Sequence, residues 1–365
     1  MGQCIRCGKQ SILISSPLDT CVDCIRNHFD DVKPHLDRVH ARSRAIFSLP
    51  AKPPKSEHGI ICQFCVNQCQ ILPEEMGFCG TRLNIGKKLI GGRPNEGNLS
   101  WYHDPLPTNC VGNWVCPGGT DCGYPEYSHS EKAEYGYKNQ AVFFHSCTFD
   151  CLFCQNWHFR THSSERGVEG PDFIVNGVDG KTACLCYFGG DPTPHLPYAI
   201  HASRQALEKK KGRILRICWE TNGAMNPKLL EKVAELSLKS GGCVKFDLKA
   251  WDEELHIALC GVSNGWTLSN FKRLAELIPE RPNPPFLLAS TLMVPGYVDE
   301  EEIGRIARFI ASQNPDIPYS LLAFHPQFQM QDLPRTSRQQ AQRCQEAART
   351  AGLKRVKVGN LHLLT

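Results

Sequence analysis

The chain has 365 residues, an apolar fraction of 41% and a formal net charge of +4. This length allows one large domain with an appendage, and the small charge gives no reason to expect nucleic acid as a partner. No basic start precedes an apolar run at the N-terminus, and no stretch approaches ~18 consecutive apolar residues. We therefore expect no signal peptide, no transmembrane helix, no membrane partner, and a cytoplasmic location.

The cysteines divide the chain into regions. Of the twenty cysteines, eleven precede residue 125, and many form C-x2-C groups. Disulfide scaffolds are small secreted domains, so metal ligation explains these groups better. From about residue 139 onward, strand-like and helix-like runs alternate. We predict a zinc-ribbon-like segment over 1–50, a cysteine-rich cap region over 51–138 and an α/β domain over 139–365.

The first cysteine group is a pair of C-x2-C arms, formed by Cys4, Cys7, Cys21 and Cys24. Two such arms can close a tetrahedron around one metal ion. Zinc is the usual occupant of an all-thiolate structural site, although a single iron fits the same geometry. So short a segment cannot bury enough surface to fold alone, and we expect its metal to be structural.

A second group follows in the cap region and consists of Cys62, Cys65, Cys69 and Cys79. Four thiolates make a closed site, which fits either structural zinc or an iron–sulfur cluster that relays electrons. Between these two we favour zinc. A third and less regular group is Cys110, Cys116 and Cys122, for which ligation and free thiols are equally good interpretations.

The second half of the chain predicts a parallel sheet. Its strand-like runs lie near 141–144, 184–188, 215–219, 244–248, 286–294 and 319–324, with 356–358 as a further candidate, and its helix-like runs lie at 198–210, 227–239, 268–277, 300–313 and 337–351. Alternating strands and helices imply right-handed parallel crossovers, and six such units make a partial (β/α)6 barrel. In parallel barrels the chemistry lies at the carboxyl ends of the strands.

A C-x3-C-x2-C pattern directly follows the first of these strands and consists of Cys147, Cys151 and Cys154. Three thiolates can hold three irons of a cubane [4Fe-4S] cluster and leave the fourth iron without a protein ligand. Structural clusters and zinc sites close all four positions, so this pattern indicates a reactive cofactor. A zinc knuckle is the alternative that the spacing alone leaves open.

The loops after the next three strands carry glycine and polar residues. The second strand ends in Tyr187-Phe-Gly-Gly-Asp-Pro192, where two glycines let the backbone approach a ligand closely. Trp219-Glu-Thr-Asn-Gly223 follows the third strand and Lys245-Phe-Asp-Leu-Lys249 the fourth. With the cysteine loop, these segments resemble the radical S-adenosylmethionine (SAM) enzymes, in particular the subgroup that is pyruvate formate-lyase activating-enzyme-like or memo-associated.

The resemblance covers about residues 60–365 and implies a radical SAM barrel that binds a [4Fe-4S] cluster and SAM and produces a 5'-deoxyadenosyl radical. It assigns no catalytic side chain, and it places Asp191 where the family has Glu. By position, the resemblance implies that Gly189, Gly190 and Asp191 bind the amino group of SAM, and that Glu220, Thr221 and Asp247 line a cation site. It implies that Asn222 and Lys249 hold the SAM carboxylate and ribose, and that His325 lies near the adenine.

The same resemblance implies a polypeptide substrate. Glycyl-radical activases carry extra ferredoxin cysteines after the SAM motif, whereas this chain has its extra cysteines before it, so activase is the alternative prediction. The cysteine-rich front and the barrel are similar to a methyltransferase of methanogenesis that methylates a glutamine Cα in the methyl-coenzyme M reductase alpha subunit. That likeness predicts abstraction of a peptidyl Cα hydrogen, methyl transfer from cobalamin, and an external electron donor.

No D-x-H-x-x-G motif of a cobalamin domain precedes the barrel. A corrinoid would therefore have to be held by loops of the front half, where Trp114, Tyr124 and Tyr127 are candidates for an aromatic wall. The alternative from a different functional class is an iron–sulfur electron-relay or scaffold protein that does not cleave SAM.

Overall fold

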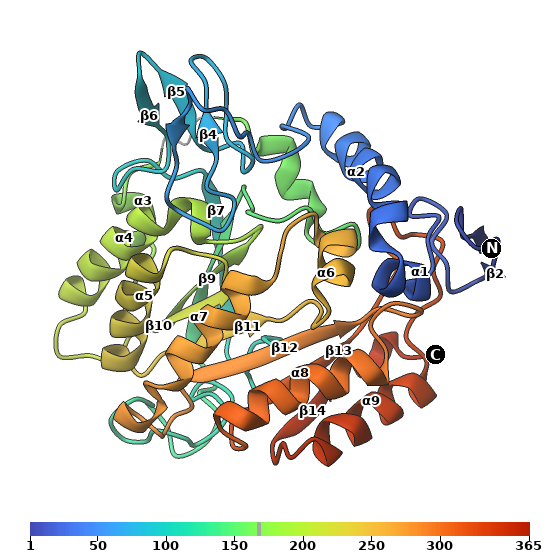
Figure 1. Ribbon diagram of the computed structural model, residues 1–365. Helices are drawn as coiled ribbons and strands as arrows, with labels where there is room; N and C mark the ends of the chain where they lie inside the picture. The colour runs from blue at the N-terminus through green and yellow to red at the C-terminus, as the bar shows by residue number, and fades with distance from the viewer. Residues whose placement is uncertain (166–168) are drawn as a thin grey trace.

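The computed structural model describes residues 1–165 and 169–365. Its central feature is an eight-stranded sheet with the order β14-β13-β12-β11-β10-β9-β8-β7 (Figure 1). β8 to β14 are parallel, whereas β7 runs antiparallel to β8. Each edge strand, β7 and β14, has a single neighbour, so the sheet is open. The predicted α/β class with a parallel sheet is confirmed.

The strands of this sheet are short and mostly buried. They span Leu99–Pro105 (β7), Lys138–Phe144 (β8), Thr182–Gly189 (β9), Arg216–Thr221 (β10), Val244–Asp247 (β11), Leu287–Met293 (β12), Tyr319–Ala323 (β13) and Val356–Gly359 (β14). All seven strand-like runs of the sequence correspond to β8–β14. β7 comes from the predicted cap region and extends the sheet beyond the α/β segment.

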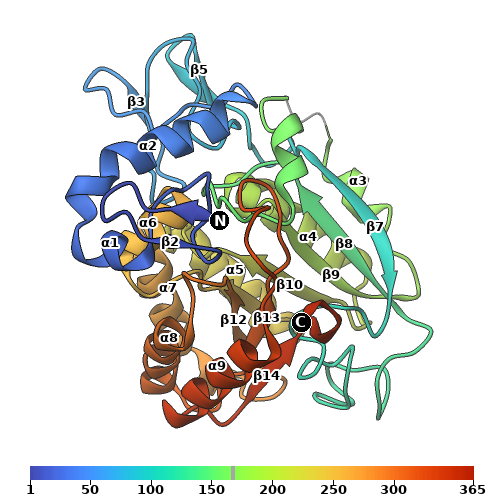
Figure 2. The same cartoon turned by 90° about the vertical axis from the view of Figure 1, so that its right-hand side faces the viewer.

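Helices follow most of the parallel strands and lie along the sheet from the β9 side to the β14 side (Figures 1 and 2). They span Asp172–Val175 (α3), Leu196–Lys209 (α4), Pro227–Ser240 (α5), Glu253–Cys260 (α6), Gly265–Ala275 (α7), Glu300–Gln313 (α8) and Arg338–Thr350 (α9). A 3-10 turn at Trp157–His162 follows the cysteine loop. Among the described residues, no helix has both the length and the apolar character needed to cross a membrane.

Local signals explain where the helices begin and end. The Asn226 side chain accepts a hydrogen bond from the Lys228 amide at the start of α5, and Pro227 occupies the first helical position. Gly241 ends α5 with a φ of 76°, a left-handed conformation that glycine adopts without a steric penalty. Asp299 caps α8 by accepting from two backbone amides. These caps fix the strand–helix junctions and therefore the loops at the sheet edge.

The N-terminal segment packs beside the sheet, on the side of α6 and α8 (Figure 1). It contains β1 (Gly2–Gln3), β2 (Gln10–Ser11), α1 (Val22–Asn27) and α2 (Phe29–Ala45). The Ser15 amide donates to the Tyr297 hydroxyl at 3.0 Å, and that hydroxyl donates to the Thr20 carbonyl at 3.0 Å. Arg26 also pairs with the buried Glu302 at 2.9 Å. The segment is thus docked through polar contacts to the loop before α8 and to α8 itself.

Two short hairpins and a long loop precede the parallel strands. The hairpins pair β3 (Ile60–Ile61) with β4 (Gln70–Ile71) and β5 (Leu83–Ile85) with β6 (Lys88–Ile90). The loop over 106–137 lies at the edge where the parallel strands begin. There the fully buried Glu134 pairs with Arg216, the first residue of β10. This ion pair fixes the loop to the sheet.

We expect Tyr297→Phe to loosen the N-terminal segment. The substitution leaves the buried Ser15 amide and Thr20 carbonyl without the hydroxyl that joins them, at a cost of about 1–3 kcal/mol. Chemical unfolding should show that loss, and limited proteolysis should cut faster within residues 1–50. Tyr135→Phe is the matched control, because Tyr135 is 76% exposed. Equal stability of the two variants would contradict the docking role of Tyr297.

Candidate active site

The three cysteines after β8 line a cavity of about 340 Å³. The cavity lies at the carboxyl ends of the parallel strands, as expected for a barrel-like sheet. Its walls bring together residues from the cysteine loop and from β9 to β13, including Cys147, Cys151, Cys154, Gly189, Gly190, Asp191, Glu220, Thr221, Asn222, Asp247 and Lys249. Eight of the nine predicted cofactor-binding residues therefore face the same cavity as the three thiols.

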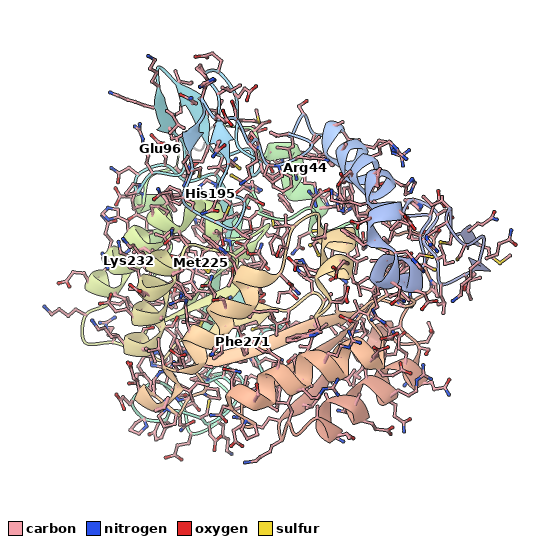
Figure 3. The ribbon with its side chains drawn as sticks, in the orientation of Figure 1. Arg44, Glu96, His195, Met225, Lys232 and Phe271 are labelled. Carbon is pink, nitrogen blue, oxygen red and sulfur yellow. The ribbon has the colours of Figure 1, made fainter. Side chains whose placement is uncertain are left out.

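A buried carboxylate anchors the cysteine loop. Asp150 is fully buried and accepts hydrogen bonds from Arg160 at 2.6 Å and from His40 Nδ1 at 2.8 Å. Arg44 lies 3.7 Å away, and Figure 3 shows it between α2 and the 3-10 turn. Burial alone would raise the pKa of Asp150, but Arg160 and His40 hold the pKa below its usual value. The carboxylate is thus ionised and ties the loop to α2.

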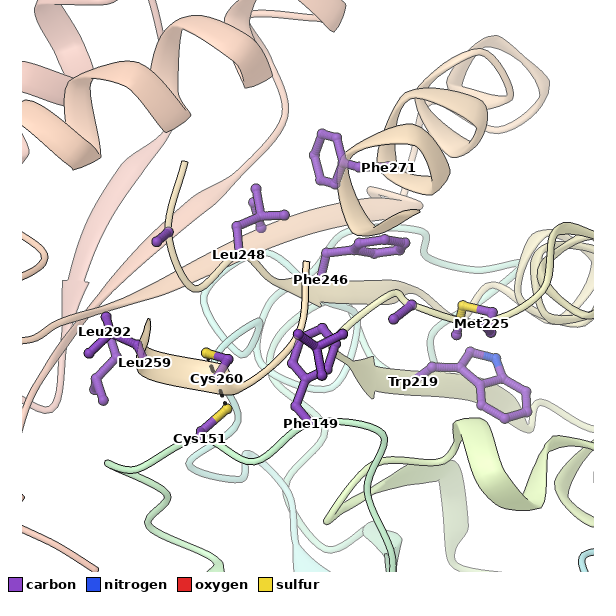
Figure 4. Packing of buried hydrophobic residues seen from close by; sticks show 14 of the residues in the cluster. Phe149, Cys151, Trp219, Met225, Phe246, Leu248, Leu259, Cys260, Phe271 and Leu292 are labelled. Atoms are coloured by element: carbon purple, nitrogen blue, oxygen red, sulfur yellow. Dashed lines mark hydrogen bonds between the residues drawn. The ribbon is translucent and has the colours of Figure 1, made fainter. Parts of the chain in front are cut away.

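The cysteine loop is also fixed to α6. The Asp150 amide donates to the Cys260 carbonyl at 2.8 Å, and the Leu152 amide donates to the Leu259 carbonyl at 2.9 Å. Cys151 Sγ lies 3.5 Å from Cys260 Sγ in an apolar surrounding that includes Phe149 (Figure 4). These contacts make the thiol positions part of the packed core.

The three thiols suit a cluster better than a single ion. Among the described residues, the sulfurs of Cys147, Cys151 and Cys154 do not form a group within 4.8 Å of one another. A cubane binds each thiolate through a different iron and so needs separated sulfurs. Burial raises the pKa of the Cys154 thiol to about 11, so the thiolate has to form as the metal binds.

The Gly189-Gly190 turn is a place where backbone must stand close to the cysteine loop. Gly189 has a φ of 110°, and a Cβ on Gly190 would lie 2.1 Å from the Ser146 carbonyl oxygen. The Gly190 amide donates to the Phe144 carbonyl at 2.9 Å. Any side chain at Gly190 would therefore push the β9 turn away from the cysteine loop.

Asp191 joins the turn after β9 to the loop after β10. Its carboxylate accepts from the Thr193 amide at 2.8 Å, the Asn222 amide at 2.7 Å and the Thr221 hydroxyl at 3.0 Å. Burial raises the pKa of Asp191 although these donors act in the opposite direction. The Asn222 side chain in turn donates to the Thr148 hydroxyl at 2.8 Å, next to Cys147.

The remaining charged residues of the cavity are paired. Glu220 accepts from Lys245 at 2.7 Å, and Asp247 accepts from Lys249. Burial opposes ionisation of Glu220, but Lys245 holds its pKa below the usual value. Within the described ranges, these carboxylates belong to no compact group of metal ligands. Glu220, Thr221 and Asp247 do line one cavity, and their role at a cation remains a prediction.

His325 lies outside this set. It is absent from the residues that line the 340 Å³ cavity. Its Nδ1 faces the Pro326 carbonyl at 3.0 Å, and Arg335 donates to its Nε2 at 3.1 Å. The structure thus brings His325 to the carboxyl end of β13 but does not bring it to the cavity, and its place near an adenine remains a prediction.

The two N-terminal cysteine groups differ in geometry. The sulfurs of Cys4, Cys7, Cys21 and Cys24 all lie within 4.8 Å of one another, a compact set that fits one metal ion. Those of Cys62, Cys65, Cys69 and Cys79 line a separate cavity instead. Zinc at either group remains a prediction, and the compact first group has the donor set that zinc favours.

The aromatic residues suggested for a corrinoid do not share one wall. Trp114 donates through Nε1 to the Ser320 hydroxyl and lines a cavity of about 280 Å³. Tyr124 and Tyr127 are not among the residues that line it. Tyr124 is 47% exposed, and Tyr127 lies beside Arg281. These three side chains therefore do not form one wall for a corrinoid, and cobalamin binding remains a prediction.

Sequence reasoning missed several residues of the site. Asp150 and Arg160 form the buried pair that anchors the cysteine loop, and Lys245 holds Glu220. Cys110 is a further neighbour, with its Sγ 2.9 Å from Lys245 Nζ. An acidic residue inside an otherwise apolar cysteine loop was a usable signal for Asp150. The sequence analysis named Cys110 and Lys245 in separate segments, but it gave no sign of their contact, because that contact depends on the fold of the loop over 106–137.

Comparison with known proteins identifies the class of the site. Residues 141–310, which include the cysteine loop and most of the cavity wall, match the model of the radical SAM superfamily. This segment is therefore similar to the radical SAM superfamily. The match implies a [4Fe-4S] cluster and SAM as cofactors, in agreement with the three-thiol cavity.

The similar proteins include enzymes that activate other enzymes. An isethionate sulfite-lyase activating enzyme from Desulfovibrio desulfuricans is 33% identical over 143 residues, which are 39% of this chain and 41% of that protein. An uncharacterized protein from Methanocaldococcus jannaschii is 21% identical over 312 residues, or 84% of this chain and 82% of that protein. A crystal structure of a domain of pyruvate-formate lyase-activating enzyme from Bacteroides vulgatus aligns with a TM-score of 0.38 and 22% identity, covering 48% of this chain and 98% of that one.

The coverage limits what these names transfer. The matched parts span 41% and 40% of two isethionate sulfite-lyase activating enzymes. The chain is thus similar to radical SAM activating enzymes over part of its length, and its own substrate is a matter for proposal.

We expect Asp150→Asn to release the cluster loop. The variant leaves the buried Arg160 without its anionic partner, which costs about 3–5 kcal/mol. Anaerobically purified variant should retain less iron and unfold at lower denaturant. Asp316→Asn is the matched control, because Asp316 pairs with Lys354 at an exposed site and should change stability by less than about 1 kcal/mol. Iron retention equal to that of the control would refute the anchoring role.

Proposed function

We propose that the chain is a protein-modifying radical SAM enzyme that abstracts a hydrogen atom from a polypeptide Cα. The observation that carries this proposal is the single cavity of about 340 Å³, which three cluster thiols share with the glycine turn and the polar loops after β10 and β11. The cavity has thiols that could bind a cluster and, next to them, charged and hydrogen-bonding groups that could bind a polar cofactor. The radical SAM match over residues 141–310 supports the same chemistry.

When bound, the cluster supplies one electron and SAM supplies the radical that removes hydrogen. The protein positions these groups. Cys147, Cys151 and Cys154 would hold the cluster, and the Gly189-Gly190 backbone lines the same cavity, where SAM would bind beside it. Lys249 would offer a positive charge to the SAM carboxylate, and the paired Asp247 would face the cation site predicted from the sequence. Their mutual pairing orients both side chains before a ligand arrives.

The place for a substrate adjoins the cofactor cavity. The 280 Å³ cavity that Trp114 lines shares Asn109, Val111, Leu322 and Asn360 with the cofactor cavity. Lys357 and His362 complete its polar side. This space suits one residue of a polypeptide, while the rest of the substrate stays outside. A substrate residue presented here would stand next to the reactive cofactor.

The relatives support a protein as substrate. The named relatives include an isethionate sulfite-lyase activating enzyme and a pyruvate formate-lyase 1-activating enzyme, and both names describe activation of another enzyme. Activation of a glycyl-radical enzyme is therefore one candidate outcome of the proposed Cα hydrogen abstraction.

The other candidate is cobalamin-dependent Cα-methylation of a glutamine in the methyl-coenzyme M reductase alpha subunit. It is supported by the similarity of the cysteine-rich front to that of a methyltransferase of methanogenesis.

The cysteines support a reducing compartment for this activity. All twenty cysteines are free thiols in the structure. Low-potential clusters and free thiols persist in reducing surroundings, so we propose a cytoplasmic location and a one-electron donor from that compartment.

We expect the anaerobically purified protein to release 5'-deoxyadenosine from SAM when dithionite is added. Cys151→Ala should abolish that release, because it removes a cluster ligand. Cys344→Ala should not, because Cys344 lies buried in α9, outside the residues that line the cofactor cavity. Chromatography with mass detection measures the product. A protein that holds its clusters but releases no 5'-deoxyadenosine would instead be an electron-relay or scaffold protein.

The target is then tested with two substrates. A glycyl-radical enzyme should gain a radical signal in electron paramagnetic resonance if the chain is an activase. A glutamine-containing reductase peptide should gain one methyl group, only with cobalamin present, if the chain is the methyltransferase. SAM cleavage without either product would retain the radical SAM function and exclude these two targets.

A further inference from the structure

We propose that Cys62, Cys65, Cys69 and Cys79 hold a second [4Fe-4S] cluster, which passes electrons to the radical SAM cluster across a wall one residue thick. This inference rests on the proposed function, because it needs a radical SAM cluster as acceptor. The four thiols come from the segments around the β3–β4 hairpin and before β5. All four cysteines lie outside residues 141–310, the range that matches the radical SAM superfamily.

Sulfur spacing separates this site from a zinc site. A tetrahedral zinc ion with Zn–S bonds of about 2.3 Å brings its sulfurs to about 3.8 Å from one another. The Cys4 set meets that condition, with all sulfurs within 4.8 Å. Among the described residues, no three sulfurs of the Cys62 set do so, and the cluster-type thiols after β8 do not either. The second group therefore lacks the compact sulfur spacing that one zinc ion needs and that the Cys4 set has.

A small cavity separates the four thiols. They line a cavity of about 10 Å³ together with Phe64, Arg82 and Thr148. A volume of roughly 10–15 Å³ is that of one water-sized probe. A tetrahedron of thiolates closed around one ion leaves no such space at its centre. A cubane bound here would have its centre in this space and would reach the four sulfurs through its irons.

A buried cation faces the same cavity. Arg82 is 3% exposed and donates through one terminal nitrogen to the Pro194 carbonyl at 2.9 Å. Its other terminal nitrogen, Nη1, is buried and has no hydrogen-bond partner within the described part of the chain. The Phe78 amide donates to Cys69 Sγ at 3.4 Å. An oxidised cluster with four thiolates carries a charge of about −2, which Arg82 partly offsets.

The second cavity shares its wall with the cofactor cavity. Thr148 lines the second cavity and follows the cluster ligand Cys147 directly. Its hydroxyl accepts from Asn222, which lines the cofactor cavity, and its carbonyl accepts from Asn67, which lines the second. Thr193 lines the second cavity, and its amide donates to Asp191 in the first. The two sites are thus joined by hydrogen bonds through single residues.

Backbone pairing holds the two sites in this arrangement. The Val66 amide donates to the Ala224 carbonyl at 2.9 Å, and Cys65 forms an antiparallel bridge with Met225. Cys62, Cys65 and Cys69 are buried, whereas Cys79 is half-buried. Cys79 therefore marks the edge at which an outside donor approaches, and the Cys147 side marks the exit.

The electron balance needs one named co-reactant. A one-electron protein donor of the ferredoxin or flavodoxin class gives one electron to the second cluster, which goes from the 2+ to the 1+ state. The same electron then passes to the radical SAM cluster, which goes from 2+ to 1+ as the second cluster returns to 2+. No covalent bond forms or breaks, and no proton moves in these two transfers.

The first test counts metals in protein produced anaerobically with ⁵⁷Fe and purified without added iron or sulfide. We expect about eight irons and eight sulfides per chain, with Mössbauer spectra of [4Fe-4S] clusters. Cys62→Ala/Cys65→Ala should lose about half of both. Cys4→Ala/Cys7→Ala is the matched control and should retain all the sulfide. Zinc, or an iron without sulfide, at the Cys62 group would overturn the proposal.

The second test does not depend on the folding of that variant. Replacing Cys147, Cys151 and Cys154 with alanine should leave about four irons and four sulfides in one reducible cluster. The doubly reduced wild type should show spin–spin broadening in electron paramagnetic resonance that this triple variant lacks. A triple variant without iron and sulfide, or a wild type with no spin interaction, would refute the second cluster or its relay role.

Failure of this proposal can be told apart from failure of the proposed function. With dithionite, which reduces the radical SAM cluster directly, wild type and Cys62→Ala/Cys65→Ala should both release 5'-deoxyadenosine. With a flavodoxin-type donor, the variant should release at least tenfold less. If wild type and variant release equal amounts of 5'-deoxyadenosine with both donors, the relay proposal is wrong and the radical SAM function stands. If the wild type releases none with either donor, the proposed radical SAM function is wrong, whatever the iron content.

Discussion

The buried Asp150 carboxylate is the contact on which the arrangement of the site depends. It joins the cysteine loop, the 3-10 turn that carries Arg160 and the helix α2 that carries His40 and Arg44. Each His40 ring nitrogen faces an acceptor, Asp150 on one side and the Ala258 carbonyl on the other. A buried charge requires such partners, so these elements cannot separate without exposing an unpaired ion. The N-terminal segment and the cysteine loop are therefore held together as one structural unit.

The charges around this unit suit a cluster with thiolate ligands. Burial lowers the pKa of Arg44 to about 10, which still leaves the guanidinium charged near neutral pH. Arg44 and Arg160 together exceed the single negative charge of Asp150. The surplus positive charge lies beside the three thiols, where burial disfavours thiolates and a nearby cation favours them. Packing and electrostatics at the loop thus act in the same direction.

Sequence patterns predicted the features that depend on neighbours in the chain. Buried parallel strands are continuous apolar runs, and ligands on one loop have fixed spacing, so the sheet and the Cys147 loop could be inferred. The partners of Asp150 and Glu220 could not, because Arg44 and Lys245 come from distant segments. His325 shows the same limit, since its position at the end of β13 did not bring it to the cavity. Strand position fixes the edge of the sheet but not the direction of a side chain.

Asp191 connects two loops at the edge of the sheet. Its carboxylate meets three donors of this chain, the Thr193 amide, the Thr221 hydroxyl and the Asn222 amide. Those bonds join the β9 turn to the β10 loop and position Asn222 beside Thr148. Asp191 thus fixes the geometry of the wall between the two thiol-lined cavities, because its three donors come from the two loops that form that wall.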